Sequence, residues 1–410
     1  MTEKEFATKI FNAGGRAYLV GGAVRDQLRG VIPHDKDYCV TKLDADDFEK
    51  IFPNADKFGK SFPVFSLSID GKNCEVALAR TERKVGRGYH GFKVNFDKSV
   101  TIEEDLYRRD TTINAMAVDI LSDELIDPFG GADDVKNKKI RAVSEHFTDD
   151  PVRALRAARQ SAQFGFEITD ETFTAMNVCA FELGEEPTER IFAELVTALK
   201  TDKPSIFFRS LERAGLLGVT FPEIDNLRGK IQPVEFHPEG DAYEHTLQIL
   251  DKVSAVNKNP IVRFAALAHD FGKGRTPEKI LPHHYGHDAK GVDVINEMNA
   301  RMTLPRDWKK IAAFVAKNHM RATSITNEGK IVDLLTALNQ LNFVEGFKDI
   351  IRADSETLPP YLEHAEKIIP EFLKVKGNDA PPELEGSEIA KWIRDERVKI
   401  LCAIMPKIIF

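Results

Sequence analysis

Two aspartates, Asp35 and Asp37, are separated by one residue and lead into the apolar segment Tyr38–Val40. On a strand, residues two positions apart point to the same face, so both carboxylates could hold metal ions together. Two divalent ions about 4 Å apart support phosphoryl transfer, because they assist the attacking hydroxyl and neutralise the leaving group. The spacing therefore predicts a metal-dependent centre for transfer of a nucleotidyl group.

A glycine pair stands before these aspartates. Gly21 and Gly22 follow the apolar segment Ala17–Val20, and Arg25 lies about one helical turn beyond them. Glycine lets a phosphate approach the backbone closely, and arginine adds a bidentate cationic contact. A glycine pair alone is usually only a tight turn, but beside two metal-binding carboxylates it predicts a site for a nucleoside triphosphate.

Several further polar residues could complete such a site, and each has a simpler alternative. Arg109 could clamp a triphosphate, although adjacent arginines such as Arg108 and Arg109 often only begin a solvated helix. Asp110 and Asn114 could contact a ribose or stabilise the loop that holds them. Glu75 could be a third metal ligand or a solvent-facing strand residue.

Arginines recur at a spacing of three in the predicted helix Pro151–Phe166, at Arg153, Arg156 and Arg159. They share an arc of about 120° on the helix, which an exposed charged stripe would also do. A functional interpretation is available, because the acceptor Asp150 beside Arg153 could hydrogen-bond the edge of a base. Protein side chains would then choose the incoming nucleotide without a nucleic-acid template.

Composition sets the broad class of protein. The 410 residues are 42% apolar and 30% charged with a net charge of −8, a soluble profile with room for two or more domains. The acidic sum argues against a general nucleic-acid binder, but the basic segment 80–93 leaves room for a local groove. Four scattered cysteines without a C-x-x-C pair predict reduced thiols in a cytoplasmic protein, and no signal peptide or membrane span is expected.

The pattern of apolar residues divides the chain near residue 145. Before it, strands are predicted at Ala17–Val20, Tyr38–Val40, Val64–Ile69 and Cys74–Ala79. After it, helices are predicted at Pro151–Phe166, Glu189–Leu199, Ile206–Leu217, His245–Val256, Ile261–Asp270 and Trp308–Lys317. The predicted fold class is α+β, with a mixed head followed by helices.

Histidines are crowded between residues 237 and 319. Seven of the chain's 11 lie there, at His237, His245, His269, His283, His284, His287 and His319. A single buried histidine is usually a core residue. His245 followed by the adjacent pair His269 and Asp270 is instead a set of ligands that suits a divalent transition metal.

The chain closely resembles the class II tRNA nucleotidyltransferases, the bacterial CCA-adding enzymes. The resemblance is continuous over residues 17–225, and its motifs are LVGGAVRD (19–26), HDKD (34–37), RRDTTINAMA (108–117), DPFGG (127–131) and DDPVRALRAARQSAQFGF (149–166). It implies a polymerase-β-like nucleotidyltransferase head and an all-helical neck. The predicted domains are the head (1–145), the neck (146–225), an HD domain (226–331) and a helical tail (332–410).

This resemblance also implies roles for single residues. The catalytic residues would be Asp35 and Asp37, which would bind Mg²⁺. The nucleotide-binding set would be Gly22, Arg25, Arg109, Asp150, Arg153, Arg156 and Arg159. Within it, Asp150 and Arg153 would select C or A. The segments 80–84 and 86–89 resemble the family's flexible loop, which is needed when the pocket switches from C to A.

The histidine segment resembles the HD-domain metal phosphohydrolases, whose pattern is H…HD…D and which are also attached to CCA-adding enzymes of this type. The resemblance implies His245, His269 and Asp270 as ligands of a divalent transition metal, and hydrolysis of cyclic phosphates. The closing aspartate is expected directly after His319, where this chain has Met320. One metal ligand is therefore expected to be missing.

The sequence thus predicts template-independent addition of CCA to tRNA 3′ ends from CTP and ATP, with release of pyrophosphate, by a cytoplasmic monomer or homodimer. A sister enzyme that adds only CC, only A or poly(A) is one alternative. The Arg80–Gly91 loop argues against CC-only addition, and the lack of a strongly basic tail argues against poly(A) addition. The other alternative is an HD phosphohydrolase with a vestigial head, against which the intact Asp35 and Asp37 pair argues.

Overall fold

The computed structural model describes residues 1–58, 63–86, 91–235, 238, 240–355 and 357–409. The chain forms two compact units. The first, here called the head unit, comprises Met1–Glu194 and Ile206–Thr220, and the second, the helical unit, comprises Leu195–Ser205 and Phe221–Phe410. The predicted α+β class is confirmed. Among the described residues, no helix has both the length and the apolar composition needed to cross a membrane.

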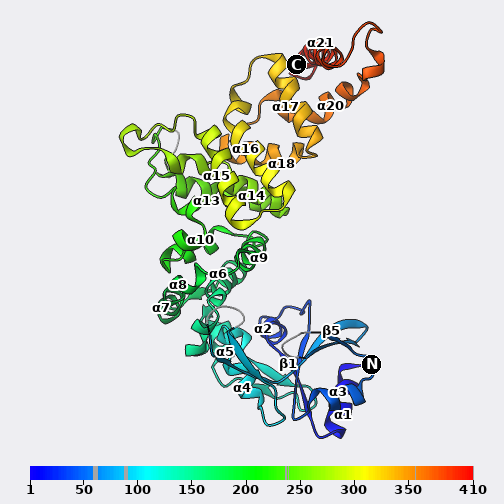
Figure 1. Ribbon diagram of the computed structural model, residues 1–410, viewed down its shortest axis with the longest axis vertical. Coiled ribbons are helices and arrows are strands. Elements are labelled where there is room, and N and C mark those ends of the chain that lie inside the picture. Colours follow the sequence, from blue (N-terminus) through cyan, green and yellow to red (C-terminus); the bar gives the residue numbers. More distant parts are fainter. Residues whose placement is uncertain (59–62, 87–90, 236–237, 239, 356, 410) are drawn as a thin grey trace. The chain divides into compact units, whose positions relative to one another are not determined.

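The head unit is built on a seven-stranded sheet with the strand order β3-β4-β5-β2-β1-β8-β9 (Figure 1). β2 and β5 pair in parallel, and the other neighbours are antiparallel. The strands are β1 (Arg16–Val20), β2 (Asp37–Thr41), β3 (Asp56–Phe58), β4 (Val64–Ile69), β5 (Lys72–Leu78), β8 (Ala117–Asp119) and β9 (Leu125–Ile126). The four predicted strands coincide with β1, β2, β4 and β5.

Both faces of the central strands are buried, which explains why their sequences are apolar runs and do not alternate with polar residues. On one face Tyr18 and Cys39 pack with Leu106 of α4 (Ile102–Tyr107). On the other, the Tyr38 ring lies 5.5 Å from that of Phe6 of α1 (Glu3–Asn12). This packing holds the ends of the central strands rigidly. The candidate site lies at one of these ends, where β1 ends and β2 begins.

The head unit contains further short elements around this sheet. Two small sheets pair β6 (Thr81–Lys84) with β7 (Phe92–Asn95) and β10 (Lys139–Ile140) with β11 (Glu167–Ile168). The remaining elements up to residue 183 are α2 (Gly22–Leu28), α3 (Ala45–Ile51), the 3-10 helix η1 (Thr112–Asn114), α5 (Gly131–Asn137), the 3-10 helix η2 (Glu145–Asp149), α6 (Val152–Phe164), α7 (Asp170–Val178) and α8 (Ala180–Leu183).

Three helices follow α8, namely α9 (Thr188–Ala198), α10 (Ser205–Arg213) and α11 (Leu217–Thr220). α6 and α9 match the predicted helices within three residues. The predicted helix Ile206–Leu217 is divided into α10 and α11, because the chain turns at Gly215, which has a φ of +71°. A left-handed backbone of this kind favours glycine and ends a helix.

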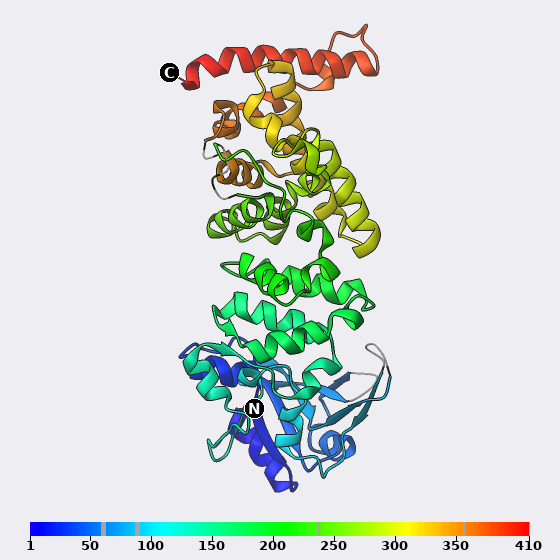
Figure 2. The ribbon, with the colours of Figure 1, turned by 90° about the vertical axis from the view of Figure 1, so that its left-hand side faces the viewer.

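The helical unit consists of packed helices (Figures 1 and 2). Its elements are α12 (Pro222–Asp225), α13 (Ala242–Val256), α14 (Pro260–Ala268), the 3-10 helices η3 (Phe271–Arg275) and η4 (Glu278–Ile280), α15 (His287–Met302), α16 (Arg306–Ser324), α17 (Glu328–Gln340), α18 (Val344–Ser355), α19 (Pro360–Glu363), α20 (Ala365–Lys374), the 3-10 helix η5 (Gly377–Asp379) and α21 (Ser387–Ile409). The predicted helix His245–Val256 lies within α13, and the predicted helix Trp308–Lys317 lies within α16. The predicted helix Ile261–Asp270 covers α14 from its second residue and the two residues after it.

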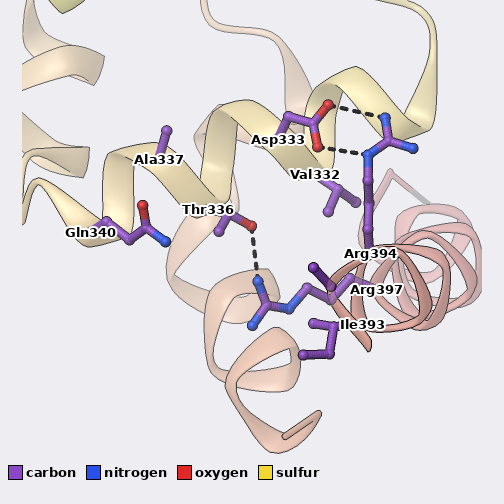
Figure 3. A pocket seen from close by; sticks show the side chains of 9 residues that line it. Val332, Asp333, Thr336, Ala337, Gln340, Ile393, Arg394 and Arg397 are labelled. Carbon is purple, nitrogen blue, oxygen red and sulfur yellow. Dashed lines mark hydrogen bonds and ion pairs between the residues drawn. The ribbon is translucent and has the colours of Figure 1, made fainter. Parts of the chain in front are cut away.

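One hydrophobic core connects most of this unit. Buried residues of α13, α14 and α16 to α20, with Leu401 of α21, form a single cluster. The α17–α21 contact is also polar, since Arg394 donates to both oxygens of Asp333 and Arg397 donates to Thr336 beside a cleft of about 260 Å³ (Figure 3). The predicted boundary between residues 331 and 332 falls inside α17, and the division into four domains stays a prediction.

Arg263 is a fully buried cation in the helical unit. Its guanidinium donates hydrogen bonds to the carbonyl oxygens of Asn257, Leu199, Thr201 and Ser254, at 2.5–2.7 Å. A buried charge costs a large desolvation free energy unless all its donors are paired. Arg263 therefore binds the segment 195–205 to α13 and α14.

We expect Arg263→Met to lower the free energy of unfolding of the helical unit by about 3 kcal/mol, because it leaves four backbone acceptors without their charged donor. Urea unfolding followed by circular dichroism measures the change. The exposed Arg306 on α16 provides the matched control, and Arg306→Met should change the free energy of unfolding by no more than about 0.5 kcal/mol. Equal effects of the two substitutions would contradict this role of Arg263.

Candidate active site

The guanidinium groups of Arg25 and Arg109 lie against the turn between β1 and α2. Gly21 has a φ of +67°, and its N–H donates to the Met116 carbonyl at 3.1 Å. A Cβ atom at Gly21 would lie 2.8 Å from Arg109 Nη1, and one at Gly22 would lie 3.3 Å from Arg25 Nη2. The two glycines thus leave room for two guanidinium groups directly against the backbone.

Both of these arginines are held by the same asparagine. Arg25 Nη1 donates to Asn114 Oδ1 at 2.6 Å, and Arg109 Nη1 donates to the Asn114 carbonyl at 3.3 Å. Arg25 also lies over the Phe164 ring, 4.2 Å from its centroid, and Arg109 pairs with the buried Asp105. Two oriented cations beside a glycine turn can bind the phosphates of a nucleotide.

Asp37 is the first residue of β2 and lies between Val20 of β1 and Glu75 of β5. Burial and the charges of Glu75 and Asp35 raise the pKa of Asp37, and Arg109 opposes this shift. Glu75 itself is exposed, so it is both a solvent-facing strand residue and a neighbour of Asp37. A divalent cation fits here, because it would relieve the repulsion between these carboxylates.

Asp35 differs from the expectation. It lies in a bend before β2 and not on the strand, with its side chain 90% exposed and 3.1 Å from His34 Nδ1. The prediction that strand geometry aligns Asp35 with Asp37 is therefore wrong. Asp35 is nonetheless close enough for its charge to act on Asp37.

The polar residues of α6 and the turn before it all have partners in the head unit. Arg190 donates to both oxygens of Asp150, at 3.0 and 2.8 Å. Arg153 is buried, donates to the His146 carbonyl and lies 3.8 Å from Glu82.

The other two arginines of α6 are paired in the same way. Arg156 donates to Asp110 at 2.7 Å, and Arg159 donates to Glu194 at 2.6 Å. Arg153 and most of the Arg159 side chain are buried, so the three arginines are not a uniformly solvated stripe, although the Arg156 side chain is 44% exposed. Arg190 and Glu194, both on α9, were not identified from the sequence.

Asp110 is a buried carboxylate of the head site with several hydrogen-bond donors around it. Its oxygens accept hydrogen bonds from the Arg156 and Gln160 side chains and from the Thr111 N–H and Asn114 side chain. Burial raises the pKa of Asp110, but Arg156 and these hydrogen bonds outweigh it, so the net pKa lies well below the usual value. Of the two roles expected for Asp110, the structure supports stabilisation of the loop.

The loop expected to act in switching from C to A begins with β6. Glu82 of β6 accepts hydrogen bonds from Arg80 and Arg108 and, as noted above, lies near Arg153. The start of this loop is thus in contact with an arginine of α6. Residues 87–90, which complete the expected loop, lie outside the described residues.

In the helical unit, His245 of α13, His269 and Asp270 converge as predicted. His269 Nε2 lies 3.2 Å and His245 Nε2 3.7 Å from Asp270 Oδ2. All three are buried, and their possible ligand atoms all lie within 4.8 Å of one another. Burial lowers the pKa of His245, but its hydrogen bond to Asp354 and the charge of Asp270 shift it above the usual value.

A further carboxylate, that of Asp354 near the end of α18, lies beside the two histidines of this group. Asp354 Oδ1 lies 3.0 Å from His245 Nε2 and 3.8 Å from His269 Nε2. Met320, at the position expected for the closing aspartate, is more than half exposed, and the identity of the closing ligand stays a prediction. Asp354 comes 84 residues after Asp270, so that only the packing of α18 against α13 brings it into the site.

The other histidines divide into two groups. His287 and His319 are buried and face Asp270, with which they form a second group of possible metal ligands. His284 bonds to Thr276 and to the Ile231 carbonyl, and His283 stacks on Tyr285. His237 lies outside the described residues.

Three known families match consecutive parts of the chain. The Poly A polymerase head domain matches residues 17–141, and the probable RNA and SrmB-binding site of polymerase A matches residues 165–228. The HD domain matches residues 242–339. The head therefore has the fold of nucleotide-transferring enzymes, and the histidine cluster lies in an HD domain.

Curated relatives extend over nearly the whole chain. The multifunctional CCA protein of Acinetobacter baumannii (strain SDF) is 38% identical over 403 residues, covering 94% of this chain and 97% of that protein. The multifunctional CCA protein of Shewanella denitrificans is 43% identical over 310 residues, or 74% of each chain. The chain belongs to the family of multifunctional CCA proteins, as its motifs predicted.

Solved structures share the fold at lower identity. The CCA-adding enzyme of Bacillus stearothermophilus in complex with CTP has a TM-score of 0.61 and 23% identity, covering 98% of this chain and 92% of that one. The Thermotoga maritima CCA-adding enzyme complexed with tRNA has a TM-score of 0.64 and 20% identity, covering 99% and 93%. These likenesses support the fold.

The ionised form of Asp110 should stabilise the head unit. Because the pKa of Asp110 is lowered in the folded state, its contribution is complete above the unfolded value of about 3.9 and is lost as the pH falls below it. We expect Asp110→Asn to lower the free energy of unfolding by about 2 kcal/mol at pH 7, since the paired Arg156 is partly solvated.

Urea unfolding between pH 7 and pH 3 tests this expectation. The difference between the original protein and Asp110→Asn should shrink as the pH falls below 4. The exposed Asp133 provides a control, because Asp133→Asn should have little effect at any pH. A difference that stays constant down to pH 3 would mean that the charge of Asp110 does not stabilise the fold.

Proposed function

We propose that this protein adds CCA to tRNA 3′ ends from CTP and ATP, without a nucleic-acid template, and releases pyrophosphate. The observation that carries the proposal is the 38% identity to a multifunctional CCA protein over 94% of the chain. Enzymes of the same fold have been solved with CTP, with ATP and with tRNA. The local chemistry of the head agrees, since Asp37, Arg25 and Arg109 surround the Gly21–Gly22 turn.

In this proposal Arg25 and Arg109 bind the triphosphate, and Asp35 and Asp37 hold Mg²⁺, with Glu75 next to Asp37. When bound, Mg²⁺ ions would assist attack of the tRNA 3′-hydroxyl on the α-phosphate and neutralise the departing pyrophosphate. Arginine suits the first role because its planar group contacts two phosphate oxygens at once. Asp35 is exposed before β2, so it can reach toward Asp37 without strain in the sheet.

Base selection is assigned to Asp150 and Arg153. Arg190 holds the carboxylate of Asp150 through two hydrogen bonds, and the His146 carbonyl holds Arg153. An acceptor and a donor fixed by neighbouring groups can discriminate between bases, since each lost hydrogen bond leaves an unpaired polar group. Glu82 connects Arg153 with the start of the loop expected to act in the switch from C to A.

The full nucleotide-binding set proposed is Gly22, Arg25, Arg109, Asp150, Arg153, Arg156 and Arg159. We further propose a four-part organisation with the boundaries 1–145, 146–225, 226–331 and 332–410, in which the tRNA acceptor stem is bound by phosphate and shape contacts. A monomer or homodimer in the cytoplasm remains our prediction. The sister activities are disfavoured, because the relatives that match 94% and 74% of the chain are CCA proteins.

Removing a carboxylate of the metal pair should stop addition of both nucleotides. We expect Asp37→Ala and Asp35→Ala each to slow incorporation of C and of A on the order of 10³-fold, because the charge stabilisation of the transition state is lost. Incorporation of labelled CTP and ATP into tRNA transcripts measures this. Asp133→Ala, on the exposed side of α5, is the control, and loss of only one of the two bases would contradict a shared metal centre.

A second activity is favoured by the histidine cluster. We propose that the HD domain holds a divalent transition metal through His245, His269, Asp270 and Asp354, and hydrolyses cyclic phosphates. The observation behind it is that His269 Nε2 and Asp270 Oδ1 are buried without a hydrogen-bond partner among the described residues, whereas Asp270 Oδ2 lies 2.5 Å from the Lys273 ammonium. Buried polar atoms of this kind are costly unless an ion binds them. Imidazole with carboxylate is a ligand set for Mn²⁺, Co²⁺ or Ni²⁺.

The two activities should separate by mutation. We expect Asp354→Ala to reduce phosphate release from 2′,3′-cyclic AMP, assayed with Ni²⁺ or Mn²⁺, by about a hundred-fold, because a metal ligand is removed. CCA addition by the same variant should be unchanged. Glu345→Ala, an exposed carboxylate on the same helix, is the matched control. Normal hydrolysis by Asp354→Ala would show that Asp354 is not a ligand.

A further inference from the structure

The aromatic ring of Phe164 lies against two arginines, one within α2 and one directly after it. The guanidinium carbon of Arg25 lies 4.2 Å from the centre of the ring, and that of Arg29 lies 4.6 Å from it. A cation within about 6 Å of a ring centre is attracted by the negative face of the ring. Phe164 is the last residue of α6. The helix that carries Arg153 near its start therefore ends against the arginine proposed to bind the triphosphate.

The backbone after α6 fixes the place of this ring. Gly165 ends the helix with a φ of +67°, and its N–H donates to the Ser161 carbonyl at 2.9 Å. The Ser161 hydroxyl donates to the Phe166 carbonyl at 2.7 Å, and the ring of the buried Phe166 lies 5.8 Å from that of Phe164. The Phe164 ring is thus held by its own helix end and does not depend on the arginines for its position.

Arg25 keeps two donors for a ligand. Its Nε and Nη2 donate to the two oxygens of Asp26, both at 3.1 Å, and its Nη1 donates to Asn114. Among the described residues these bonds use three of the five N–H donors of the guanidinium, which leaves one on Nη1 and one on Nη2. Two donors on one planar group suit two oxygens of a phosphate. The orientation of this plane therefore decides whether both donors reach the phosphate.

The hydrogen bonds of Arg25 do not balance its charge by themselves. Arg29 Nη1 also donates to Asp26, at 3.1 Å, so that two cations share one carboxylate. Like charges four positions apart on a helical segment repel each other. The side chain of Arg25 is only 10% exposed, so water stabilises its charge less than at the surface. The face of the Phe164 ring supplies the remaining attraction, which an aliphatic side chain of similar size would not do.

We propose that Phe164 is a positioning residue for nucleotide binding, whose ring holds the Arg25 guanidinium in the orientation that contacts the triphosphate. The inference rests on the nucleotide site proposed above and adds to it a residue that acts through Arg25. One helix then serves both ends of the nucleotide. α6 contributes to recognition of the base through Arg153 and to recognition of the phosphates through the contact of Phe164 with Arg25.

Binding measurements on the full-length protein in Mg²⁺ test the proposal without reference to catalysis. Calorimetric titration gives the affinity for CTP, and displacement of CTP gives the affinity for inorganic tripolyphosphate, which has no base. We expect Phe164→Leu to weaken both affinities about five-fold, because the loss lies in the phosphate contacts. Phe164→Met, whose flexible side chain also fills the space, should do the same and decides the matter if the leucine variant does not fold. Phe164→Tyr should bind normally.

A double-mutant cycle with Arg25→Ala shows whether the ring acts through Arg25. In the Arg25→Ala protein, adding Phe164→Leu should weaken binding by less than about two-fold, because the partner of the ring is absent. Phe11→Leu is the control, since Phe11 is an exposed aromatic residue of α1, and it should leave both affinities unchanged.

Two results would overturn the role of Phe164 and leave the proposed nucleotide site intact. The first is normal binding of CTP and tripolyphosphate by Phe164→Leu and Phe164→Met. The second is an equal loss of affinity with and without Arg25, which would mean that the ring acts by another route. Failure of the original protein to bind CTP at all would instead overturn the nucleotide site itself, and the role of Phe164 with it.

Discussion

The carboxylate of Asp110 connects the residues around the Gly21–Gly22 turn with helix α6, and the geometry of the head site depends on it. One of its oxygens accepts from Arg156 and Gln160 of α6, and the other accepts from the Asn114 side chain. Asn114 in turn accepts the hydrogen bonds that position Arg25 and Arg109. One buried negative charge therefore orients the groups proposed to bind the triphosphate and the helix proposed to select the base. Low local polarity strengthens each of these bonds.

Asp270 is the corresponding buried carboxylate of the helical unit, but its surroundings are different. Every oxygen of Asp110 is satisfied by protein donors, so its role is structural. Both oxygens of Asp270 face imidazole nitrogens, and Oδ1 lacks a hydrogen bond among the described residues, while Oδ2 pairs with the Lys273 ammonium. A polar network in which every atom has a protein hydrogen-bond partner makes a fold rigid. A network held by rigid helices in which some polar atoms lack a partner is suited to bind an ion. The same residue type is thus enclosed by protein donors in one unit and is proposed to bind a metal ion in the other.

The sequence predicted elements and motifs better than it predicted contacts between distant segments. β1, β2, β4 and β5 were found because buried strands form apolar runs, and the head motifs identified the family. Asp35 was assigned to a strand because spacing alone does not indicate where pairing begins. Asp354 was missed because 84 residues separate it from Asp270, and no local pattern marks a carboxylate that a packed helix brings beside the histidines. Arg190 was missed for the same reason, since only tertiary structure aligns it with Asp150.

The most direct test of the central claim uses three tRNA transcripts, ending at the discriminator base, at C and at CC. Each is incubated with the purified protein, Mg²⁺ and CTP, ATP or both, and the products are sequenced. The account predicts that all three end in CCA when both nucleotides are present, and that the first two stop at CC when only CTP is present. Addition of C alone, of A alone or of long A tails with both nucleotides would contradict it, as would no addition at all.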